Sequence, residues 1–255
     1  MSKIVCERLL GKVAIVTAST EGIGFAIAQR LAQEGAKVLI SSRKQANVDK
    51  AVKSLANKGL NVKGLVCHVS KSDHRNQLFQ EAQKLGGLDI LVSNAAVNPE
   101  VGGVLDATEE SWEKIFDVNV KASFLLAKES LPLLRQSKAG RIIFVSSISG
   151  FQPFNLLGAY SVSKTALLGL SKAAALQLAS ENITVNCIAP GVIKTKFSST
   201  LTTGPAEEIA LSQIPLNRFG VPDNISGIAA MLASDDGAYI TGESIIAAGG
   251  MPSRL

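Results

Sequence analysis

Tyr160 and Lys164 stand four residues apart at the start of a long run with apolar residues at helical spacing. Side chains at this spacing lie one above the other on a helix, so the Lys164 ammonium is expected near the Tyr160 phenol. A free phenol titrates near about 10, and a neighbouring cation favours its ionised form. The pair could therefore transfer a proton, with Ser147, thirteen residues upstream, supplying a second hydroxyl. An ordinary surface pair has the same spacing, so the rest of the chain must decide.

A glycine-rich turn follows the first apolar run. Val13–Thr17 is β-branched and apolar, as a buried strand would be, and Gly22 opens a segment with helical periodicity. Glycines between a strand and a helix let the backbone approach a pyrophosphate, and the unpaired N–H groups of the helix start attract it. We therefore assign four residues of this turn to a dinucleotide site: Ser19, Gly22, Ile23 and Gly24.

The next expected strand, Lys37–Ser41, ends about twenty residues after this turn, where a dinucleotide fold presents a side chain to the adenosine ribose. An NAD site places an acidic residue there, whereas this chain has Ser42, Arg43 and Lys44. A cationic pair beside a hydroxyl suits the 2′-phosphate of NADP(H). The same residues could simply form the exposed entry to a helix, and both interpretations remain open at this point.

The bulk composition excludes several classes of protein. The 255 residues are 46% hydrophobic, enough for one α/β domain with a large core. Three scattered cysteines, Cys6, Cys67 and Cys187, fit a reducing compartment and predict no metal site. The net charge is +5, but the basic residues are dispersed, so no nucleic-acid partner is expected. No apolar window suggests a signal peptide or a membrane span.

Strand-like and helix-like segments alternate along the chain, which predicts a doubly wound Rossmann domain over residues 1–255, with a mostly parallel sheet flanked by helices. Thr108 is expected to cap a helix that Pro132 bends or ends, and residues 192–213 lack periodicity, as a substrate lid would. The expected strands are 13–17, 37–41, 62–67, 88–93, 140–146, 183–188 and 244–247. The expected helices begin near Gly22 and cover 45–57, 72–85, the segment after Thr108, the Tyr160 segment and 223–233.

In such a sheet ligands bind at the carboxyl ends of the strands. Five separate signals fall at such ends and are expected to meet in one crevice. They are Ala18–Gly24, Ser42–Arg43, Asn94, Ser147 and Pro190–Thr195.

These motifs, in this order, resemble the short-chain dehydrogenase/reductase family from Lys12 to Gly250. The resemblance implies a seven-stranded sheet, NADP(H) as cofactor, a small carbonyl substrate and a homotetramer. It also implies that Tyr160 is the general acid, that Ser147 binds the carbonyl oxygen and that Lys164 lowers the pKa of Tyr160 and holds the nicotinamide ribose. Asn119, between Val118 and Val120, would hold a water that links Lys164 to solvent. The implied cofactor neighbours are His68, Val69, Asn94, Tyr160, Lys164, Ile193 and Thr195.

The chain departs from the family pattern at four positions. Ala18 and Ala96 replace usual glycines, His68 stands where an aspartate often binds the adenine amino group, and Ala248 lies in a segment that lacks a usual aspartate. More narrowly, Thr17-Ala18-Ser19-Thr20 and Cys67-His68-Val69 resemble members that reduce ketones, α-dicarbonyls or retinal with NADPH in peroxisomes. A catalytically silent NADP(H)-binding or scaffold protein is the alternative, against which the four catalytic-type residues argue.

The last three residues, Ser253-Arg254-Leu255, resemble the peroxisomal tail Ser-Lys-Leu with one cation exchanged for another. This tail predicts recognition by a peroxisomal import receptor and a peroxisomal location. A frayed end of a cytosolic enzyme is the alternative.

Overall fold

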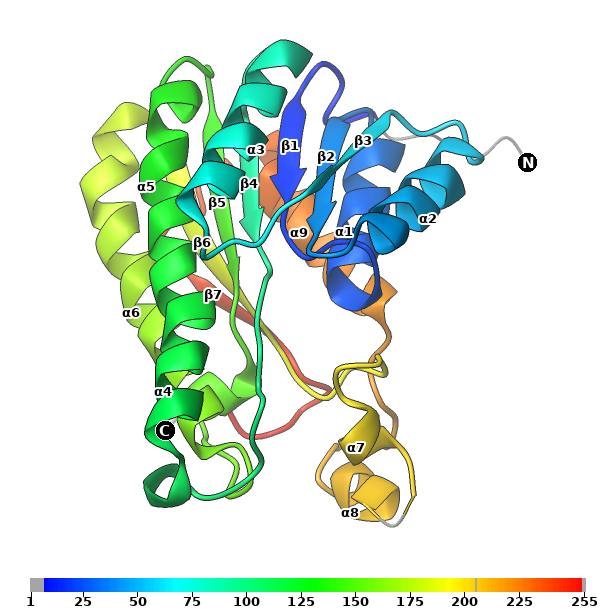
Figure 1. The fold of residues 1–255 in the computed structure, drawn as a ribbon, viewed down its shortest axis with the longest axis vertical. Coiled ribbons are helices and arrows are strands. Elements are labelled where there is room, and N and C mark those ends of the chain that lie inside the picture. Colours follow the sequence, from blue (N-terminus) through cyan, green and yellow to red (C-terminus); the bar gives the residue numbers. More distant parts are fainter. Residues whose placement is uncertain (1–6, 205, 254–255) are drawn as a thin grey trace.

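The computed structural model describes residues 7–204 and 206–253, and it is built around one seven-stranded sheet (Figure 1). The strand order is β3-β2-β1-β4-β5-β6-β7, and all six pairings are parallel. The predicted doubly wound parallel sheet is therefore confirmed. The strands are β1 (Val13–Val16), β2 (Lys37–Ser42), β3 (Val62–Val66), β4 (Ile90–Ser93), β5 (Gly140–Val145), β6 (Ile183–Pro190) and β7 (Ser244–Ala247).

Helices cover both faces of the sheet (Figure 1). One face carries α1 (Gly22–Gln33), α2 (Gln45–Ala56) and α9 (Pro222–Ala233). The other carries α3 (Ser72–Leu85), α5 (Ala122–Leu134) and α6 (Gly158–Leu178), and α4 (Glu109–Phe116) extends this layer toward the carboxyl ends of the strands. Among the described residues, no helix has both the length and the apolarity needed to cross a bilayer.

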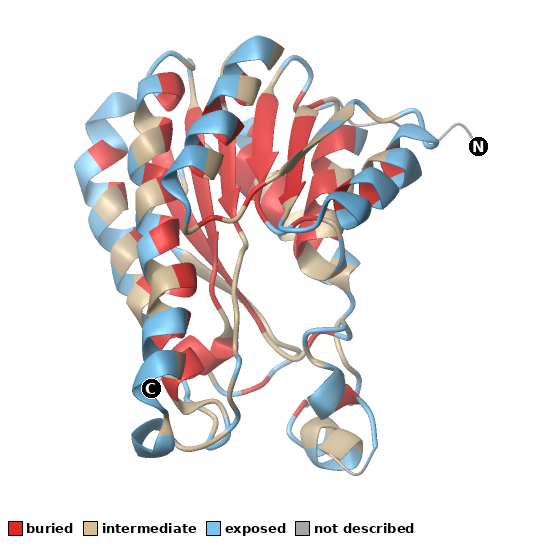
Figure 2. Cartoon of the chain, in the orientation of Figure 1, coloured by how far each residue is buried: buried red, intermediate tan, exposed pale blue. Residues whose placement is uncertain are grey.

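The strands supply side chains to two cores, one under each helical layer, and Figure 2 shows the sheet buried between them. In β1, Val13 and Ile15 face the layer of α3, α5 and α6, whereas Ala14 and Val16 face α1 and α9. This alternation follows from the two-residue period of a strand. It explains why the strand sequences read as continuous apolar runs, since both faces are covered.

Pro132 was expected to bend or end its helix, and the structure shows that it does not end it, while the bend stays a prediction. α5 continues through Pro132 to Leu134. Proline removes the hydrogen bond to the carbonyl four residues earlier, which here belongs to Lys128. Pro132 and Lys128 are both exposed, so water can satisfy that carbonyl. Thr108 does cap α4 as predicted, since its hydroxyl accepts a hydrogen bond from the Ser111 N–H at 3.2 Å.

The helix expected after Thr108 is not one continuous α-helix. A π-helical turn, Asp117–Lys121, joins α4 to α5 and contains Asn119. Such turns are rare and often mark functional sites. A π-helical turn adds one residue to a turn of an α-helix, and this change is too small to be seen in the apolar periodicity of the sequence. The turn was therefore not predicted.

The segment 192–213, expected to be irregular, contains two short helices, α7 (Ser199–Thr202) and α8 (Ala206–Ser212). In Figure 1 they project below the body of the molecule, beyond the carboxyl ends of the strands. β6 is also longer than predicted, because Pro190 still pairs with Ala247 of β7. Of the predicted targeting tail, Arg254 and Leu255 lie outside the described residues.

Candidate active site

Tyr160 and Lys164 share one face of α6, as their spacing predicts. Both are buried, with exposed fractions of 8% and 2%, and the Lys164 Nζ lies 5.5 Å from the centre of the Tyr160 ring. The ammonium donates a hydrogen bond to the Val145 carbonyl at 2.8 Å, at the end of β5. The alternative of an ordinary surface pair is therefore ruled out, because both side chains are buried.

The expected effect of Lys164 on Tyr160 is not seen. Burial raises the pKa of Tyr160, and only the interaction with the Ser147 hydroxyl lowers it. The reason is geometric, because Lys164 lies over the ring and its ammonium is engaged by Val145. Burial also lowers the pKa of Lys164 to about 8. In this structure, therefore, Ser147 is the group that favours the Tyr160 phenolate.

Ser147 lies at the carboxyl end of β5 and begins a 3₁₀ turn, Ile148–Gly150. Two hydrogen bonds fasten the segment to α6. The Ser146 hydroxyl donates to the Lys164 carbonyl at 2.8 Å, and the Thr165 hydroxyl donates to the Gly150 carbonyl at 2.7 Å. Ser147 is thereby held in a fixed position relative to Tyr160.

Asn119 is completely buried, and its side chain bridges two elements. Its Oδ1 accepts from the Val97 N–H at 2.8 Å, while its Nδ2 donates to the Val97 carbonyl at 3.1 Å and to the Ser163 hydroxyl at 3.0 Å. Both amide protons are thus used within the protein. The side chain ties α6 to the segment after β4, and the expected water between Asn119 and Lys164 stays a prediction.

The glycine-rich turn is pressed against Asn94. The Asn94 Nδ2 donates to the carbonyls of Thr17 and Ala18, both at 3.1 Å, and a Cβ on Gly24 would lie only 2.5 Å from this Nδ2. Thr17, which the sequence did not single out, accepts at its hydroxyl from the N–H groups of Asn94 and Ala95. Position 24 therefore requires glycine, because any side chain there would clash with Asn94.

Ser19 was assigned to the cofactor, but its hydroxyl points into the protein. It donates to the Val16 carbonyl at 2.6 Å and accepts from the Ser41 N–H at 3.0 Å. Ser19 is fully buried, and its hydroxyl stabilises the turn through these two hydrogen bonds.

The segment after β6 closes the other side of the turn. Gly22, at φ +60°, faces Thr195, whose Cγ2 lies 3.4 Å from the Cβ that Gly22 lacks. Ser198 holds this segment, since its hydroxyl accepts from the Thr195 N–H at 3.1 Å and donates to the Ile193 carbonyl. Ile23 follows Gly22 in the first turn of α1. The free N–H groups at this helix start, facing Thr195, fit a pyrophosphate.

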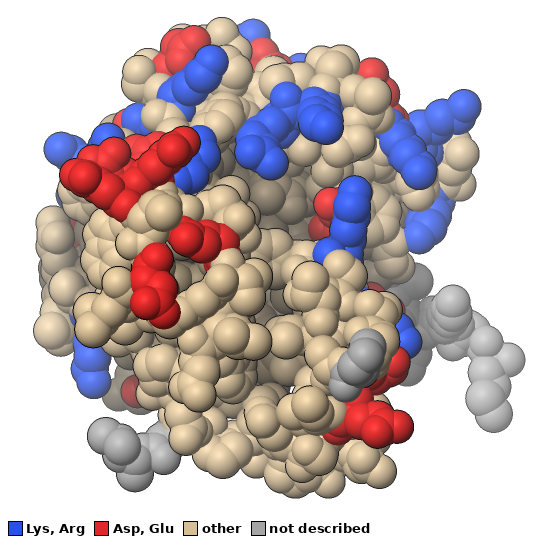
Figure 3. Space-filling view, turned by 60° about the horizontal axis from the view of Figure 1, so that its bottom comes forward, with Lys and Arg blue, Asp and Glu red and all other residues tan. Residues whose placement is uncertain are grey.

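Arg43 and Lys44 are exposed at the end of β2, and Ser42 is half-buried there. His68 and Val69 follow β3, the neighbouring strand. Burial, then Lys114, Arg43 and Lys71, lower the pKa of His68, and its Nδ1 is buried without a hydrogen-bond partner. In Figure 3 basic side chains border a hollow on this face of the molecule. The ends of β2 and β3 are therefore cationic and retain an unsatisfied polar atom.

An aromatic side chain lies beside Tyr160. The Phe197 ring lies 5.9 Å from the Tyr160 ring, centre to centre. Ile148, next to Ser147, packs in a small cluster with Phe154 and Val192. The side of Tyr160 that Phe197 faces is therefore apolar.

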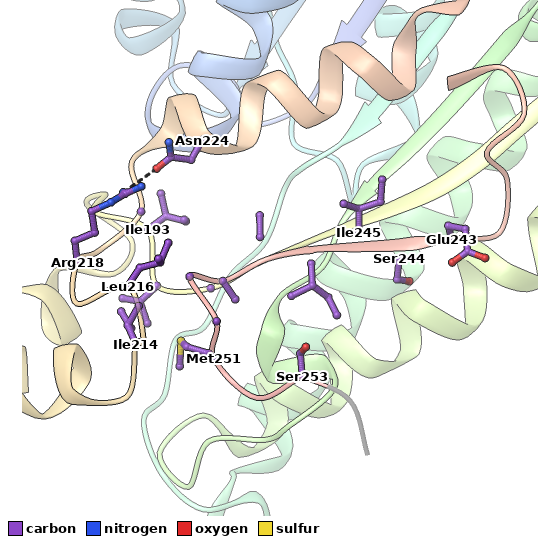
Figure 4. A pocket seen from close by; sticks show the side chains of 18 of the residues that line it. Ile193, Ile214, Leu216, Arg218, Asn224, Glu243, Ser244, Ile245, Met251 and Ser253 are labelled. Atoms are coloured by element: carbon purple, nitrogen blue, oxygen red, sulfur yellow. Dashed lines mark hydrogen bonds between the residues drawn. The ribbon is translucent and has the colours of Figure 1, made fainter. Parts of the chain in front are cut away.

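A separate cavity of about 970 Å³ lies along β7 and the segment that follows β6 (Figure 4). Arg218 and Asn224 lie at one end of it and Glu243 at the other. Its lining includes Ile193 but none of the four predicted catalytic residues. Among residues 7–204 and 206–253, no group of three or more metal-ligating side chains occurs.

Residues 17–252 match a protein-family model described as enoyl-(acyl carrier protein) reductase. The chain is 55% identical over 251 residues to rabbit (Oryctolagus cuniculus) dehydrogenase/reductase SDR family member 4, covering 98% of this chain and 96% of the relative. The human protein of that name is 53% identical over 251 residues, with 98% and 90% covered. Short-chain dehydrogenase/reductase SDRA of Arabidopsis thaliana is 48% identical over the full length of both chains.

Solved structures share the fold. A putative gluconate dehydrogenase from Agrobacterium tumefaciens superposes with a TM-score of 0.93 at 26% identity, covering 98% of this chain and 100% of the other. A short-chain type dehydrogenase/reductase from Mycobacterium marinum gives a TM-score of 0.90 at 32% identity, with 96% and 97% covered.

Proposed function

The chain belongs to the short-chain dehydrogenase/reductase family, and we propose that it is an NADPH-dependent reductase of ketones, α-dicarbonyls or retinal. As a member it is an oxidoreductase that uses a nicotinamide cofactor. The observation that carries the proposal is that Ser147 and the buried Lys164 both lie beside the buried Tyr160. A catalytically silent protein would have no reason to retain a buried lysine there.

The reduced nicotinamide, when bound, supplies the hydride. Gly22, Ile23 and Gly24 would hold its pyrophosphate at the start of α1, and Asn94, Ile193 and Thr195 would border its nicotinamide half. The missing Cβ atoms at positions 22 and 24 and the unsatisfied His68 Nδ1 support this fit.

Tyr160 gives its proton to the carbonyl oxygen in this proposal, and Ser147 donates a hydrogen bond to the same oxygen as negative charge develops. Lys164 supplies a positive charge beside the Tyr160 ring at neutral pH, since its pKa is about 8. That charge favours the phenolate left after proton transfer once Lys164 can move from the Val145 carbonyl. Asn119 fixes α6 through Ser163, whose hydroxyl donates to the Tyr160 carbonyl at 2.6 Å.

The cationic end of β2 supports a preference for NADPH over NADH. Arg43 can bind a 2′-phosphate in bidentate fashion, with Ser42 and Lys44 beside it, and none of these three residues is acidic. Arg43→Asp should raise KM for NADPH about 10- to 100-fold and leave KM for NADH nearly unchanged. Lys50→Asp, an exposed charge change on α2, is the matched control. Equal use of both cofactors by the unmodified protein would contradict the preference.

The Phe197 ring beside Tyr160 supports bulky apolar carbonyls as substrates. The direct test follows NADPH absorbance while the protein is mixed with aliphatic ketones, aromatic α-dicarbonyls and all-trans-retinal. We expect the apolar substrates to give the higher kcat/KM. NADPH binding without turnover of any carbonyl would instead favour the silent NADP(H)-binding protein.

We also propose a homotetramer, because apolar hollows occur on two different faces. One is the cavity along β7, and of the described strands none pairs with the outer edge of β7. The other, about 690 Å³, lies on α4 and α5, where Phe124 is 44% exposed. Two distinct interfaces between identical copies generate a closed tetramer. Light scattering should then give four times 26.7 kDa, and a monomer mass would refute the assembly.

We further propose that an import receptor binds Ser253-Arg254-Leu255 and directs the enzyme to peroxisomes. A fluorescent protein fused to the N-terminus should overlap with a peroxisomal marker and become diffuse when residues 253–255 are deleted. A diffuse full-length fusion in cells with normal peroxisomal import would instead indicate a cytosolic enzyme.

A further inference from the structure

Ser149, to which the family resemblance gives no role, donates two hydrogen bonds to the side-chain oxygen of Ser147. The Ser149 N–H donates to the Ser147 Oγ at 3.1 Å, and the Ser149 hydroxyl donates to the same oxygen at 3.0 Å. Ser149 is completely buried, so water does not compete for these bonds. The Ser147 oxygen is therefore served by two donors from a single residue.

A serine hydroxyl has two acceptor lone pairs and one proton. With both lone pairs occupied, the Ser147 hydroxyl can act only as a donor. Without the Ser149 hydroxyl, one lone pair would be free to accept a hydrogen bond from the Tyr160 hydroxyl, which would turn the Tyr160 proton away from a substrate. The direction in which Ser147 shifts the pKa of Tyr160 agrees with the donor orientation, because donation to the phenol oxygen favours the phenolate.

The backbone around Ser149 leaves this arrangement little freedom. A Cβ on Gly150 would lie 2.8 Å from the Lys164 carbonyl carbon, so the turn is pressed directly onto α6. The bonds from Ser146 and Thr165 fasten it on both sides. The position of the Ser149 hydroxyl is thus set by the same helix that carries Tyr160.

We propose that Ser149 is a positioning residue of the active site. Its hydroxyl occupies the second acceptor position of Ser147 and keeps the Ser147 proton directed at the substrate carbonyl. This inference rests on the proposed carbonyl reduction and identifies how the oxygen-binding hydroxyl of that reaction is oriented.

The test is a double-mutant cycle with NADPH and an aromatic α-dicarbonyl, using Ser149→Ala, Ser147→Ala and the double variant. Ser149→Ala keeps the backbone N–H bond and removes only the hydroxyl. We expect kcat to fall about 3- to 10-fold, the usual effect of losing one neutral hydrogen bond, with KM for NADPH unchanged. In the Ser147→Ala background the same change should have no effect on kcat, because Ser149 acts only through Ser147.

Ser130→Ala is the matched control, since Ser130 is also fully buried and its hydroxyl bonds within α5, to the Ala127 carbonyl. It should not change kcat. If Ser149→Ala fails to fold, Ser149→Cys replaces it in the cycle, because a thiol keeps the shape and is a weaker donor.

An unchanged kcat in Ser149→Ala would overturn the inference and leave the proposed reductase intact. An equal fall in both backgrounds would overturn it too, because the effect would then be general damage to the turn. If the unmodified protein reduces no carbonyl, the proposed function fails and the inference fails with it.

Discussion

Ala18 adopts a backbone conformation that favours glycine, and replacing it should stabilise the protein. Its φ is +49°, in the left-handed region, which costs a residue with a Cβ about 1–2 kcal/mol. Ala18 is exposed, so removing its methyl group sacrifices little packing, and the hydrogen bond from Asn94 goes to its backbone carbonyl, which glycine keeps. The strain at this position can therefore be relieved without losing a contact.

The gain is reduced by the unfolded chain, in which glycine has about 0.4–1 kcal/mol more conformational entropy to lose. The difference leaves Ala18→Gly more stable by up to about 1.6 kcal/mol, with a central value of about 0.8 kcal/mol. For a chain of this size, the central value corresponds to a rise in Tm of about 1–4 °C. The measurement is urea unfolding without cofactor, at one protein concentration, with the m-value required to stay constant.

Ala173→Gly provides the matched comparison, because Ala173 is also exposed but lies inside α6. There the same substitution should lower the free energy of unfolding by about 1 kcal/mol. Opposite signs for the two substitutions would establish that backbone conformation decides the outcome. A loss of stability in Ala18→Gly similar to that in Ala173→Gly would refute the reasoning.

Three further predictions concern the catalytic helix. Tyr160→Phe should lower kcat about 10²- to 10⁴-fold, because it removes the proton donor, while the NADPH dissociation constant measured by fluorescence stays within a factor of about two. Gly158→Ala should lower kcat about 100-fold, because the Cβ of the new alanine would overlap the Val104 backbone and shift the start of α6. Wild-type kinetics in this variant would show that the segment around Val104 moves instead. Lys164→Met should abolish turnover. It should also raise the free energy of unfolding at pH 7 by about 1–3 kcal/mol, because burial lowers the pKa of Lys164 from 10.5 to about 8, which means that the charged side chain destabilises the folded state. Since the unfolded chain binds the extra proton between pH 8 and 10.5, this stability difference should shrink as the pH rises through that window, and a constant difference would contradict the assignment.

The strands and most helices could be predicted because their signals are local. A strand covered on both faces must be apolar throughout, and Val13–Val16 has no other good interpretation. Thr108 likewise predicts the start of a helix, because threonine is a common N-cap residue and two acidic residues follow it. The end of the helix at Pro132 was mispredicted. The free-energy cost of a proline inside a helix depends on whether water can reach the carbonyl that loses its hydrogen bond, and this depends on the packed structure.

The electrostatics of the site could not be predicted from spacing. Four residues of separation place Lys164 near Tyr160, but the direction of the pKa shift depends on how deeply the phenol is buried and where the ammonium points. Ser19 presents the same limitation, since its place in the turn is correct while its hydroxyl faces inward. Ser149 was missed because nothing in the sequence shows that two neighbouring hydroxyls bond to one another.

Three features that cost stability lie together at the carboxyl end of the sheet. Ala18 is in the left-handed region, Lys164 is a buried cation and the Nδ1 of His68 lacks a partner, all on the side of the cofactor crevice. At the amino end of β1, by contrast, Asp89 accepts from the Val13 N–H at 2.8 Å and from a serine hydroxyl at 2.6 Å. Strain and unsatisfied polar groups persist where the rest of the structure over-determines them and a function needs them. A ligand that satisfies His68 and interacts with Lys164 should therefore stabilise this end of the sheet most, which hydrogen exchange at the segments after β1 and β3 would measure with and without NADPH.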